Sequence, residues 1–374
     1  MLKIGSLFSG YGGLDLAVAK QFDAEVVWHC EWEDAPSRIL EANFPGVPNY
    51  RDVTQVDWAS VEPVDILTGG FPCQDVSQAG RRAGLASGTR SGLWSDFAKA
   101  IDVLQPKWVV IENVRGLLNA KAGSDVEHCA WCMGETGNGE PHMRALGAVL
   151  GDLDDLGYDA EWRGVRASDA GAPHQRFRVF ILAWRGGVSV PTPTASDSMF
   201  EGLQRACTVE SRNRGVSLPL WANRIELLRT PKASDGQGGA LGEAEALKRG
   251  NSVGIRDQVM DLVAGQGHRV SRADLPLPAT KDSVTGSSEW GRFGLAVKHW
   301  EGVTGMKAPA PTKPDGKDGA HRLSSEFTEW MMGLPNGWVT GLGLSRKDEL
   351  KACGNGVVPQ QAELALRLLL EGKK

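Results

Sequence analysis

The chain has 374 residues, of which 41% are hydrophobic and 23% are charged, a balance typical of a water-soluble globular protein. No apolar run is long enough to cross a bilayer, and the opening segment MLKIGSLFSG lacks the basic start and long apolar stretch of a signal peptide. We therefore expect a cytoplasmic protein with no membrane partner, and the net charge of −5 requires any nucleic-acid-binding surface to be local.

The first 185 residues alternate between apolar strands and helices. Strands are predicted over residues 3–8, 24–30, 64–68, 108–112 and 179–183. Helices are predicted over residues 14–20, 35–43, 93–104 and 143–156. This alternation predicts an α/β fold built on a doubly wound, Rossmann-like, mostly parallel sheet.

The character of the sequence changes over residues 186–321. Pro, Gly, Ser and Thr are frequent there and the hydrophobic pattern is only weakly periodic, which predicts a smaller, irregular second domain. A disordered linker is the alternative interpretation. Trp221, Trp290 and Trp300 favour a small packed core over disorder.

Regular structure is predicted again near the end of the chain. Helices are expected over residues 325–332 and 361–370, the second of them strongly apolar. We therefore expect the segment 322–374 to return to the first domain, which spans residues 1–185.

A glycine-rich turn joins the first predicted strand to the first predicted helix, in the segment SLFSGYGGLDLA. Gly10, Gly12 and Gly13 allow a tight turn and let a ligand approach the backbone closely. Glu31 ends the second strand about twenty residues on, where a carboxylate commonly binds a ribose. The pattern favours a nucleotide-type cofactor over a purely structural turn, and the glycine spacing counts against NAD.

A cysteine stands directly after a buried strand, in the segment GGFPCQDVSQAG. Cys73 follows Pro72 and precedes a polar loop, at the edge where doubly wound sheets bind their ligands. A thiolate is strongly nucleophilic and forms near neutral pH, so we interpret Cys73 as a nucleophile rather than an inert buried thiol. Glu112 ends another buried strand, and parallel strands end at the same edge. We therefore expect Cys73 and Glu112 to face one pocket.

Two groups of arginines are candidates for binding an anionic or carbonyl-rich ligand. Arg176 and Arg178 alternate in HQRFRVF, so both side chains lie on one face if the segment is extended. The loop of residues 74–92 holds three arginines and four glycines, and we interpret it as a clasp over a bound nucleic acid. Its candidate contact residues are Gln74, Ser77, Arg81, Arg82 and Arg90. A solvated loop or strand edge is the alternative for both groups.

The motifs FSGYGG, CEW, RDVTQV, GGFPCQ, ENV, RFR and GNGVVP, in this order, resemble those of the cytosine-5 DNA methyltransferase family. The resemblance covers residues 3–184 and 322–370. It implies that the first domain binds S-adenosylmethionine and that residues 186–321 form a target recognition domain. Two departures occur: His174 replaces the glutamine that usually opens the arginine motif, and Gly356 is the small residue after the asparagine of GNG.

The resemblance also implies roles for single residues. Cys73 is expected to be the covalent nucleophile, and Glu112 is expected to contact ring nitrogen 3 of a flipped cytosine. Arg176 and Arg178 are expected to hold the base and order the site. The S-adenosylmethionine pocket is expected to be lined by Phe8, Gly10, Gly12, Gly13, Glu31, Trp32, Asp52, Val53, Pro72 and Asn355.

The implied reaction transfers a methyl group from S-adenosylmethionine to carbon 5 of cytosine in double-stranded DNA, leaving S-adenosylhomocysteine. Addition of the Cys73 thiolate to carbon 6 makes carbon 5 nucleophilic, while Glu112 stabilises the charge that develops at nitrogen 3. The base must leave the duplex to be reached. We expect a monomer. The biological role stays open between the partner of a restriction endonuclease, self-protection of a mobile element and an orphan regulator, and no endonuclease is visible in this sequence.

Three other functions are weighed against this one. The same chemistry could act on transfer RNA, although the long variable region favours DNA. The chain could be an inactive DNA-binding regulator, against which the intact Cys73, Glu112 and Arg176 count. A thiol-dependent NAD enzyme is disfavoured by the glycine spacing.

A candidate zinc site lies in the segment HCAWCMGETGNGEPH. Cys129 and Cys132 have the spacing of metal ligands, and His142 is a candidate third ligand. A fourth ligand is missing, because adjacent His128 and Cys129 chelate poorly. An ordinary loop with reduced thiols is therefore preferred to structural zinc.

Overall fold

The computed structural model describes residues 1–72, 92–118, 145–186, 227–236 and 290–371, the single residues 255 and 258, and the backbone of 133–135 and 141–143. The chain divides into two compact units. One comprises Met1–Ala170, Arg176–Gly215 and Gly356–Lys374, and the other comprises Gly171–Gln175 and Val216–Asn355. Within the described ranges, no helix is both long and apolar enough to span a membrane.

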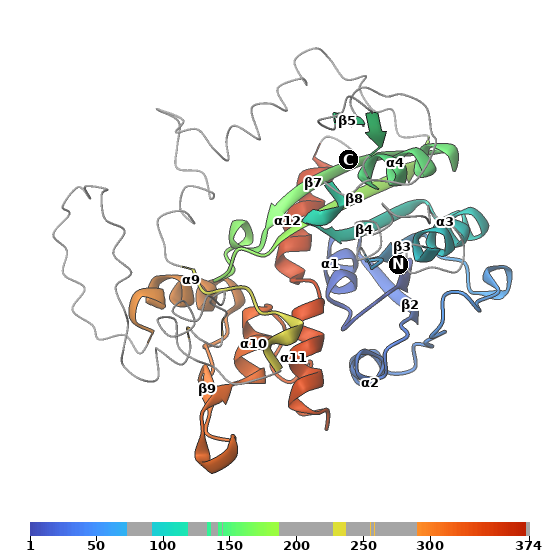
Figure 1. Cartoon of the computed structure of the whole chain (residues 1–374). Coiled ribbons are helices and arrows are strands. Elements are labelled where there is room, and N and C mark those ends of the chain that lie inside the picture. The colour runs from blue at the N-terminus through green and yellow to red at the C-terminus, as the bar shows by residue number, and fades with distance from the viewer. Residues whose placement is uncertain are drawn as a thin grey trace. The chain divides into compact units, whose positions relative to one another are not determined.

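The first unit is built on a six-stranded sheet with the strand order β2-β1-β3-β4-β8-β7 (Figure 1). These strands are β1 (Leu2–Leu7), β2 (Ala24–Cys30), β3 (Ile66–Gly69), β4 (Trp108–Val114), β7 (Tyr158–Arg166) and β8 (Phe177–Arg185). Strands β2, β1, β3 and β4 are parallel neighbours, and β8 is antiparallel to both β4 and β7. The predicted α/β fold with a mostly parallel sheet is confirmed.

The helices of the first unit alternate with these strands. They are α1 (Gly13–Phe22), α2 (Asp34–Asn43), α3 (Gly92–Leu104), α4 (Ala145–Asp155) and α12 (Pro359–Leu370), with short 3-10 turns η1 (Trp58–Ser60), η3 (Arg115–Leu118) and η4 (Ala167–Ala170). Two short strands, β5 (Met133–Glu135) and β6 (Pro141–Met143), pair with each other. The elements predicted for residues 1–185 are confirmed, with ends shifted by at most two residues.

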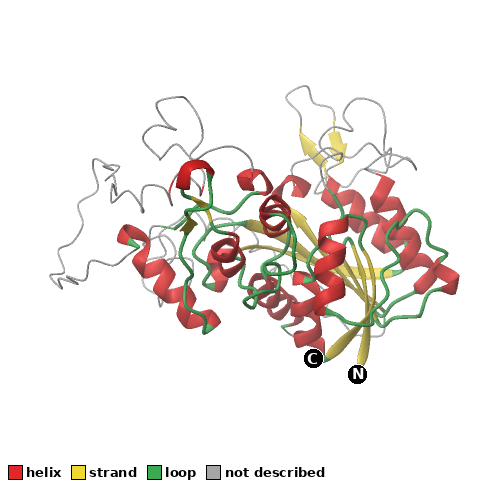
Figure 2. Cartoon of the chain, turned by 90° about the horizontal axis from the view of Figure 1, so that it is seen from below, coloured by secondary structure: helices red, strands yellow, loops and turns green. Residues whose placement is uncertain are grey.

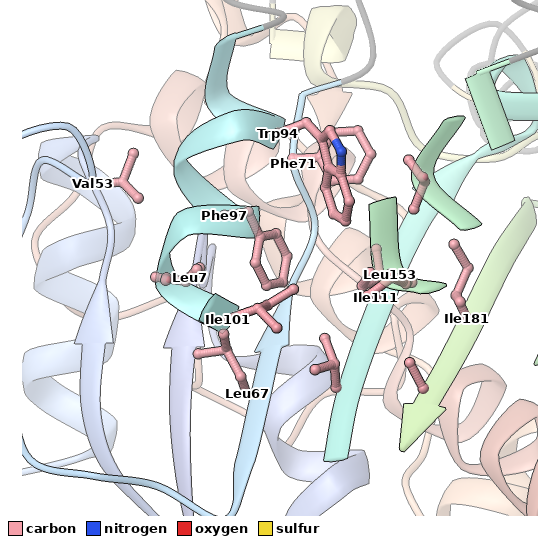
Figure 3. Packing of buried hydrophobic residues seen from close by; sticks show 14 of the residues in the cluster. Leu7, Val53, Leu67, Phe71, Trp94, Phe97, Ile101, Ile111, Leu153 and Ile181 are labelled. Atoms are coloured by element: carbon pink, nitrogen blue, oxygen red, sulfur yellow. The ribbon is translucent and has the colours of Figure 1, made fainter. Parts of the chain in front are cut away.

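Alternate residues of the central strands enter two different hydrophobic clusters. In β4, Val109 and Ile111 belong to the cluster that includes α3 and α4, whereas Val110 belongs to the cluster that includes α1 and α12. Because successive side chains of a strand point to opposite faces, each pair of helices covers one face of the sheet. Figure 2 shows helices on both sides of the strands, and Figure 3 shows Phe97 of α3 packed near Leu67.

Strand β7 is the one strand of this sheet that the sequence does not predict. It lies at the edge of the sheet, where it pairs only with β8. Its charged residues Asp159, Glu161 and Arg163 interrupt the apolar run expected of a strand buried on both faces. An edge strand tolerates them because solvent remains close.

The second unit is mostly short elements. They are η6 (Ala233–Gly236), η7 (Gly291–Phe293), α9 (Gly294–Thr304), β9 (Thr312–Lys313), η8 (Lys317–Gly319), β10 (Arg322–Leu323), α10 (Ser325–Met331) and α11 (Arg346–Asn355). The side chain of Trp300 is fully buried and donates a 2.9 Å hydrogen bond to the carbonyl of Trp330, so α9 packs on α10. Trp290 stacks on Phe327, at 5.4 Å between ring centroids. Trp221 lies outside the described residues.

The chain returns to the sheet later than the sequence predicts. The helix expected over residues 325–332 is confirmed as α10, but α10 and α11 belong to the second unit. Only the segment from Gly356 onward joins the first unit. The sequence pattern shows where helices resume. It does not show that α10 packs on Trp300, because this contact joins distant residues that no local pattern links.

Candidate active site

The predicted site residues of the first unit converge on the carboxyl edge of the sheet, because Phe8 follows β1, Glu31 follows β2, Pro72 follows β3 and Glu112 lies near the end of β4. Cys73 itself lies outside the described residues. The same holds for Gln74, Ser77, Arg81, Arg82 and Arg90. The described structure therefore shows the strand ends around this edge of the sheet, up to Pro72.

The glycine turn is fixed by the carboxylate of Glu31. Its Oε2 accepts a 2.8 Å hydrogen bond from the amide of Gly10, and its Oε1 accepts one of 2.8 Å from the amide of Glu33. Gly10 has a φ of 57°, which favours glycine. Burial raises the pKa of Glu31, and the two backbone amides oppose that rise. Each carboxylate oxygen retains acceptor capacity for a further donor, such as a ribose hydroxyl.

Two observations fit a nucleoside-bearing cofactor at this turn. Apart from Gly10 itself and its two chain neighbours, no atom of the described residues lies within 4 Å of the position that a Cβ on Gly10 would occupy. Trp32, which follows Glu31, is 67% exposed and presents an aromatic surface on which a base can stack. Two further residues expected at this pocket have structural contacts. Asp52 accepts hydrogen bonds from Thr54, and Val53 is buried in the core.

A second buried carboxylate lies beneath the glycine turn, and the sequence analysis does not single it out. Asp15, in the first turn of α1, accepts a 2.8 Å hydrogen bond from Ser6 of β1 and one of 2.6 Å from Thr68 of β3. His29 of β2 lies 3.8 Å away. Burial raises the pKa of Asp15 and lowers that of His29, and each charge opposes the shift of the other. Asp15 thus ties three strand ends to α1.

Glu112 and Arg178 form a largely buried ion pair, with 2.7 Å between Oε1 and Nε. The pair forms because β8 is antiparallel to β4, which places Arg178 opposite Val114 and on the same face as Glu112. Burial raises the pKa of Glu112, while the guanidinium groups of Arg178 and Arg176 lower it. The carboxyl group can therefore keep a proton at a higher pH than an ordinary glutamic acid.

The residue after Glu112 positions the segment that leads to Cys73. Asn113 is buried, and its side-chain amide donates a 3.1 Å hydrogen bond to the carbonyl of Phe71. Phe71 is itself buried against Trp94, at 5.1 Å between ring centroids. The ENV motif thus supplies a buried carboxyl group, Glu112, and an amide, that of Asn113, which fixes the backbone two residues before Cys73.

Arg176 departs from the predicted extended segment. Its φ is 21°, and β8 begins only at Phe177, so Arg176 and Arg178 do not form a matched pair on one strand face. The Arg176 guanidinium is buried and donates a hydrogen bond to the carbonyl of Gly356. The two arginines therefore have different partners, one a carboxylate and the other a backbone carbonyl from the end of the chain.

The GNGVVP motif enters the first unit beside the glycine turn. The hydroxyl of Tyr11 donates a 2.7 Å hydrogen bond to the carbonyl of Val357. A side chain on Gly356 would overlap the Tyr11 ring, which explains the glycine there. Asn355 is exposed and ends α11, in the second unit. Its expected contact with the cofactor stays a prediction.

The remaining sequence-predicted features are His174 and the candidate zinc ligands. His174 is buried, with Nε2 3.0 Å from the carbonyl oxygen of Met331 in the second unit. Cys129 and Cys132 lie outside the described residues, and only the backbone of His142 is described. Within the described part of the chain, no group of three or more His, Cys, Asp or Glu residues could hold a metal ion. The sequence-based preference for an ordinary reduced loop over structural zinc therefore stays a prediction.

Curated relatives match about half of this chain or somewhat more. It is 32% identical over 186 residues to the Type II methyltransferase M2.BsuMI of Bacillus subtilis, covering 49% of this chain and 42% of the relative. It is 32% identical over 215 residues to the Type II methyltransferase M.HpaII of Haemophilus parainfluenzae, covering 55% and 54%. The chain thus spans about half the length of the curated relatives that it matches.

Solved structures match over nearly the whole chain and show the fold. The S. pombe Dnmt2 methyltransferase aligns over 99% of both chains with a TM-score of 0.53 and 15% identity. A DNMT2 mutant from Spodoptera frugiperda aligns over 99% of this chain and 100% of its own with a TM-score of 0.53 and 14% identity. The sequence profile of the C-5 cytosine-specific DNA methylase family matches residues 2–369. The chain therefore belongs to the C-5 cytosine-specific DNA methylase family.

Proposed function

We propose that this protein methylates carbon 5 of a specific cytosine in double-stranded DNA, with S-adenosylmethionine as the methyl donor and Cys73 as the nucleophile. The observation that carries the proposal is the Glu112–Arg178 pair at the carboxyl edge of β4, beside the Phe71 segment that Asn113 holds. This chemistry requires a nucleophile and a carboxyl group that holds a proton; the pKa of buried Glu112 is raised, and Cys73 follows the Phe71 segment in the sequence.

The cofactor would be held by the glycine turn and the residues after β2. Gly10 and Glu31 define one side, and Trp32 offers a stacking surface for the adenine. Phe8, Gly12, Gly13, Asp52, Val53, Pro72 and Asn355 complete the proposed set. Bound S-adenosylmethionine supplies an activated methyl group on a sulfonium sulfur.

The chain's own groups then act on the cytosine. The Cys73 thiolate forms a bond to carbon 6, and the electron pair displaced from the 5,6 double bond makes carbon 5 nucleophilic. Glu112 donates a proton or hydrogen bond to ring nitrogen 3, and Arg178 keeps Glu112 in place. Once carbon 5 is methylated, a base removes its proton, the double bond reforms and the thiolate leaves.

The substrate and the cellular setting are also proposed. The relatives are named Type II methyltransferases, which supports DNA as the substrate and a restriction–modification setting with a separate endonuclease. The target base must be flipped out of the duplex, and the arginine-rich loop after Cys73 is suited to hold it there. We propose that the protein acts as a monomer in the cytoplasm.

The decisive experiment measures transfer of labelled methyl groups from S-adenosylmethionine to duplex DNA and to transfer RNA. We expect label in DNA, at cytosine carbon 5 by bisulfite sequencing, and none in transfer RNA. A preference for transfer RNA would assign the same chemistry to the other substrate. No transfer to either would support the inactive regulator, and binding of DNA without methylation would identify it.

The nucleophile is tested separately with a mechanism-based trap. Duplex DNA carrying 5-fluorocytosine cannot lose the group at carbon 5, so the Cys73 adduct should persist through denaturing electrophoresis. Cys73→Ala should form no adduct and transfer no methyl group. Cys30→Ala is the matched control, because burial raises the pKa of this thiol to about 12 and leaves it unreactive. Methylation by Cys73→Ala would overturn the mechanism.

A further inference from the structure

The last helix of the chain contacts the backbone of the arginine motif through one fully buried glutamine. The side-chain amide of Gln361, in the first turn of α12, donates 2.8 Å hydrogen bonds to the carbonyls of Val165 and Arg176. The Arg176 carbonyl also accepts a 3.2 Å hydrogen bond from the amide of Ala167. A glutamine buried in an apolar helix face loses its contact with water, so its placement calls for a specific partner.

The backbone that Gln361 holds is conformationally unfavourable. Arg176 has a φ of 21°, a region that residues with a Cβ rarely adopt. Such a conformation persists only where surrounding contacts enforce it. Two hydrogen bonds to the carbonyl and one from the guanidinium to Gly356 supply that enforcement.

The segment that carries Gly356 and Gln361 also contacts the glycine turn, on the proposed cofactor side of the site. Val357 accepts the hydrogen bond from Tyr11, and its carbonyl leaves no space for a side chain on Gly13. Residues 356–361 therefore run from the glycine turn to the arginine motif. All these contacts lie within the first unit.

We propose that Gln361 is a positioning residue for Arg176, and that residues 356–361 form a brace that keeps the arginine motif in register with the glycine turn. This inference rests on the proposed function. Gln361 touches neither substrate nor cofactor; it acts by fixing the backbone of Arg176, whose guanidinium lies near enough to Glu112 to influence its charge. The brace explains why the end of the chain must return to the sheet.

The alternative is that Gln361 only anchors α12. A pure anchor would affect stability, whereas a positioning residue should also change the behaviour of Glu112. Among the described residues, the charged groups that act on Glu112 are Arg178 and Arg176, and both lower its pKa. If Arg176 moves away when Gln361 is lost, the pKa of Glu112 rises. The fall in rate that follows loss of the Glu112 proton should then move to higher pH.

The test uses Gln361→Met, which keeps an unbranched side chain of similar length but donates no hydrogen bond. We expect kcat for DNA methylation to fall on the order of 100-fold, because a small misplacement of a catalytic group has this effect. The dissociation constant for S-adenosylmethionine should change less than about twofold, since the Gly10–Glu31 contacts are untouched. The descending limb of the pH–rate profile should move to higher pH.

Gln360→Met is the matched control, because it makes the same change one position away on a half-buried side chain. Gln361→Glu is the second variant: it keeps the shape, and we expect it to lose activity as Gln361→Met does, because a carboxylate cannot donate and a protonated carboxyl group can donate to only one of the two carbonyls. Retained cofactor binding shows that each variant is folded.

The outcomes separate the two proposals. Suppose that the wild type is active and its activity needs Cys73. If folded Gln361→Met then has a normal kcat and an unchanged pH profile, the brace is overturned and the proposed function stays intact. A variant that fails to fold under conditions where Gln360→Met is stable would identify an anchor and also overturn the positioning role. A wild type without methyl transfer would overturn the proposed function, and the brace with it.

Discussion

At the scale of single residues, the site combines a carboxyl group removed from water with a cation that partly restores its ionisation. Burial favours the neutral form of Glu112, and Arg178 at 2.7 Å favours the charged form. The acid that we propose Glu112 to be must both hold a proton and remain fixed in place, and neither effect alone provides both. The balance depends on the antiparallel register of β8, which brings Arg178 to the end of β4.

Replacing the carboxyl group of Glu112 by an amide should lower the rate of methyl transfer without changing the binding of S-adenosylmethionine. Glu112→Gln keeps the shape and a donor but cannot transfer a proton, so we expect kcat to fall by about 100-fold or more. Binding of S-adenosylmethionine should be unchanged, because Glu31 and not Glu112 contacts the glycine turn. Steady-state kinetics with duplex DNA and a cofactor titration measure the two effects. Equal losses in cofactor affinity and rate would contradict this assignment.

The pH dependence should respond to Arg178. Burial raises the Glu112 pKa, so a rate that needs its proton is retained to higher pH than for an ordinary glutamic acid and falls as pH rises through that raised pKa. Removing the opposing charge in Arg178→Gln raises the pKa further, so the descending limb should move to higher pH even though the maximal rate is lower. A limb that moves to lower pH would show that Arg178 does not act through Glu112.

At the scale of elements, the ends of β1, β2 and β3 meet the first turn of α1 at Asp15. Its two hydroxyl donors and the nearby His29 come from those three strands. The glycine turn lies directly between β1 and α1. A carboxyl group at this junction fixes the spacing of the strands under the proposed cofactor site.

Asp15→Asn should change how stability depends on pH. The folded-state pKa of Asp15 is raised by burial, so the unfolded state releases this proton at lower pH and the native state loses stability as pH rises through the raised pKa. Asparagine cannot ionise and should lack this decline. Urea unfolding from pH 5 to pH 8 should therefore show the wild type losing stability relative to Asp15→Asn as pH rises. The opposite trend would mean that Asp15 folds as a carboxylate with a depressed pKa.

Helix α12 covers one face of the sheet, although it comes from the end of the chain. Leu366 is fully buried in the cluster that α12 shares with α1. Leu366→Ala should lower the free energy of unfolding by about 2–5 kcal/mol, the usual range for a large-to-small change in a packed core. The half-buried Leu368 on the same helix provides the control, and Leu368→Ala should cost clearly less. If the two variants lost equal amounts of unfolding free energy, α12 would not be part of the cooperatively folding core.

The elements that the sequence predicts are those with a local signal. Period-two and helical patterns place β1 to β4, β8 and the flanking helices, and the motifs place Glu31 and Glu112 at strand ends. Contacts between distant segments escape prediction. Gln361 bonds to Val165 and Arg176, nearly two hundred residues away in sequence, and no local pattern marks it. The unextended backbone at Arg176 escapes for the same reason, because tertiary contacts enforce it.

At the scale of the whole molecule, a protein with a net charge of −5 has to bind a polyanion through local positive charge. The arginines next to Cys73 in the sequence are Arg81, Arg82 and Arg90, which lie outside the described residues. If these arginines contact phosphates, binding should weaken steeply with salt, because each neutralised phosphate releases counterions. The net negative charge of the protein would then weaken binding to unrelated DNA, while the local arginines would still allow binding at the target.

Single substitutions of Arg81, Arg82 and Arg90 by glutamine should test this clasp. For each arginine that contacts a phosphate, affinity for duplex DNA should fall and the slope of log K against log salt should decrease by about one. Lys107→Gln removes the same charge just before β4, at the opposite end of the strand from Glu112, and should leave the slope unchanged. Fluorescence anisotropy over a range of salt concentrations measures both quantities. If Lys107→Gln and the arginine variants behave alike, the positive charge acts through the net charge of the molecule and not through a local clasp.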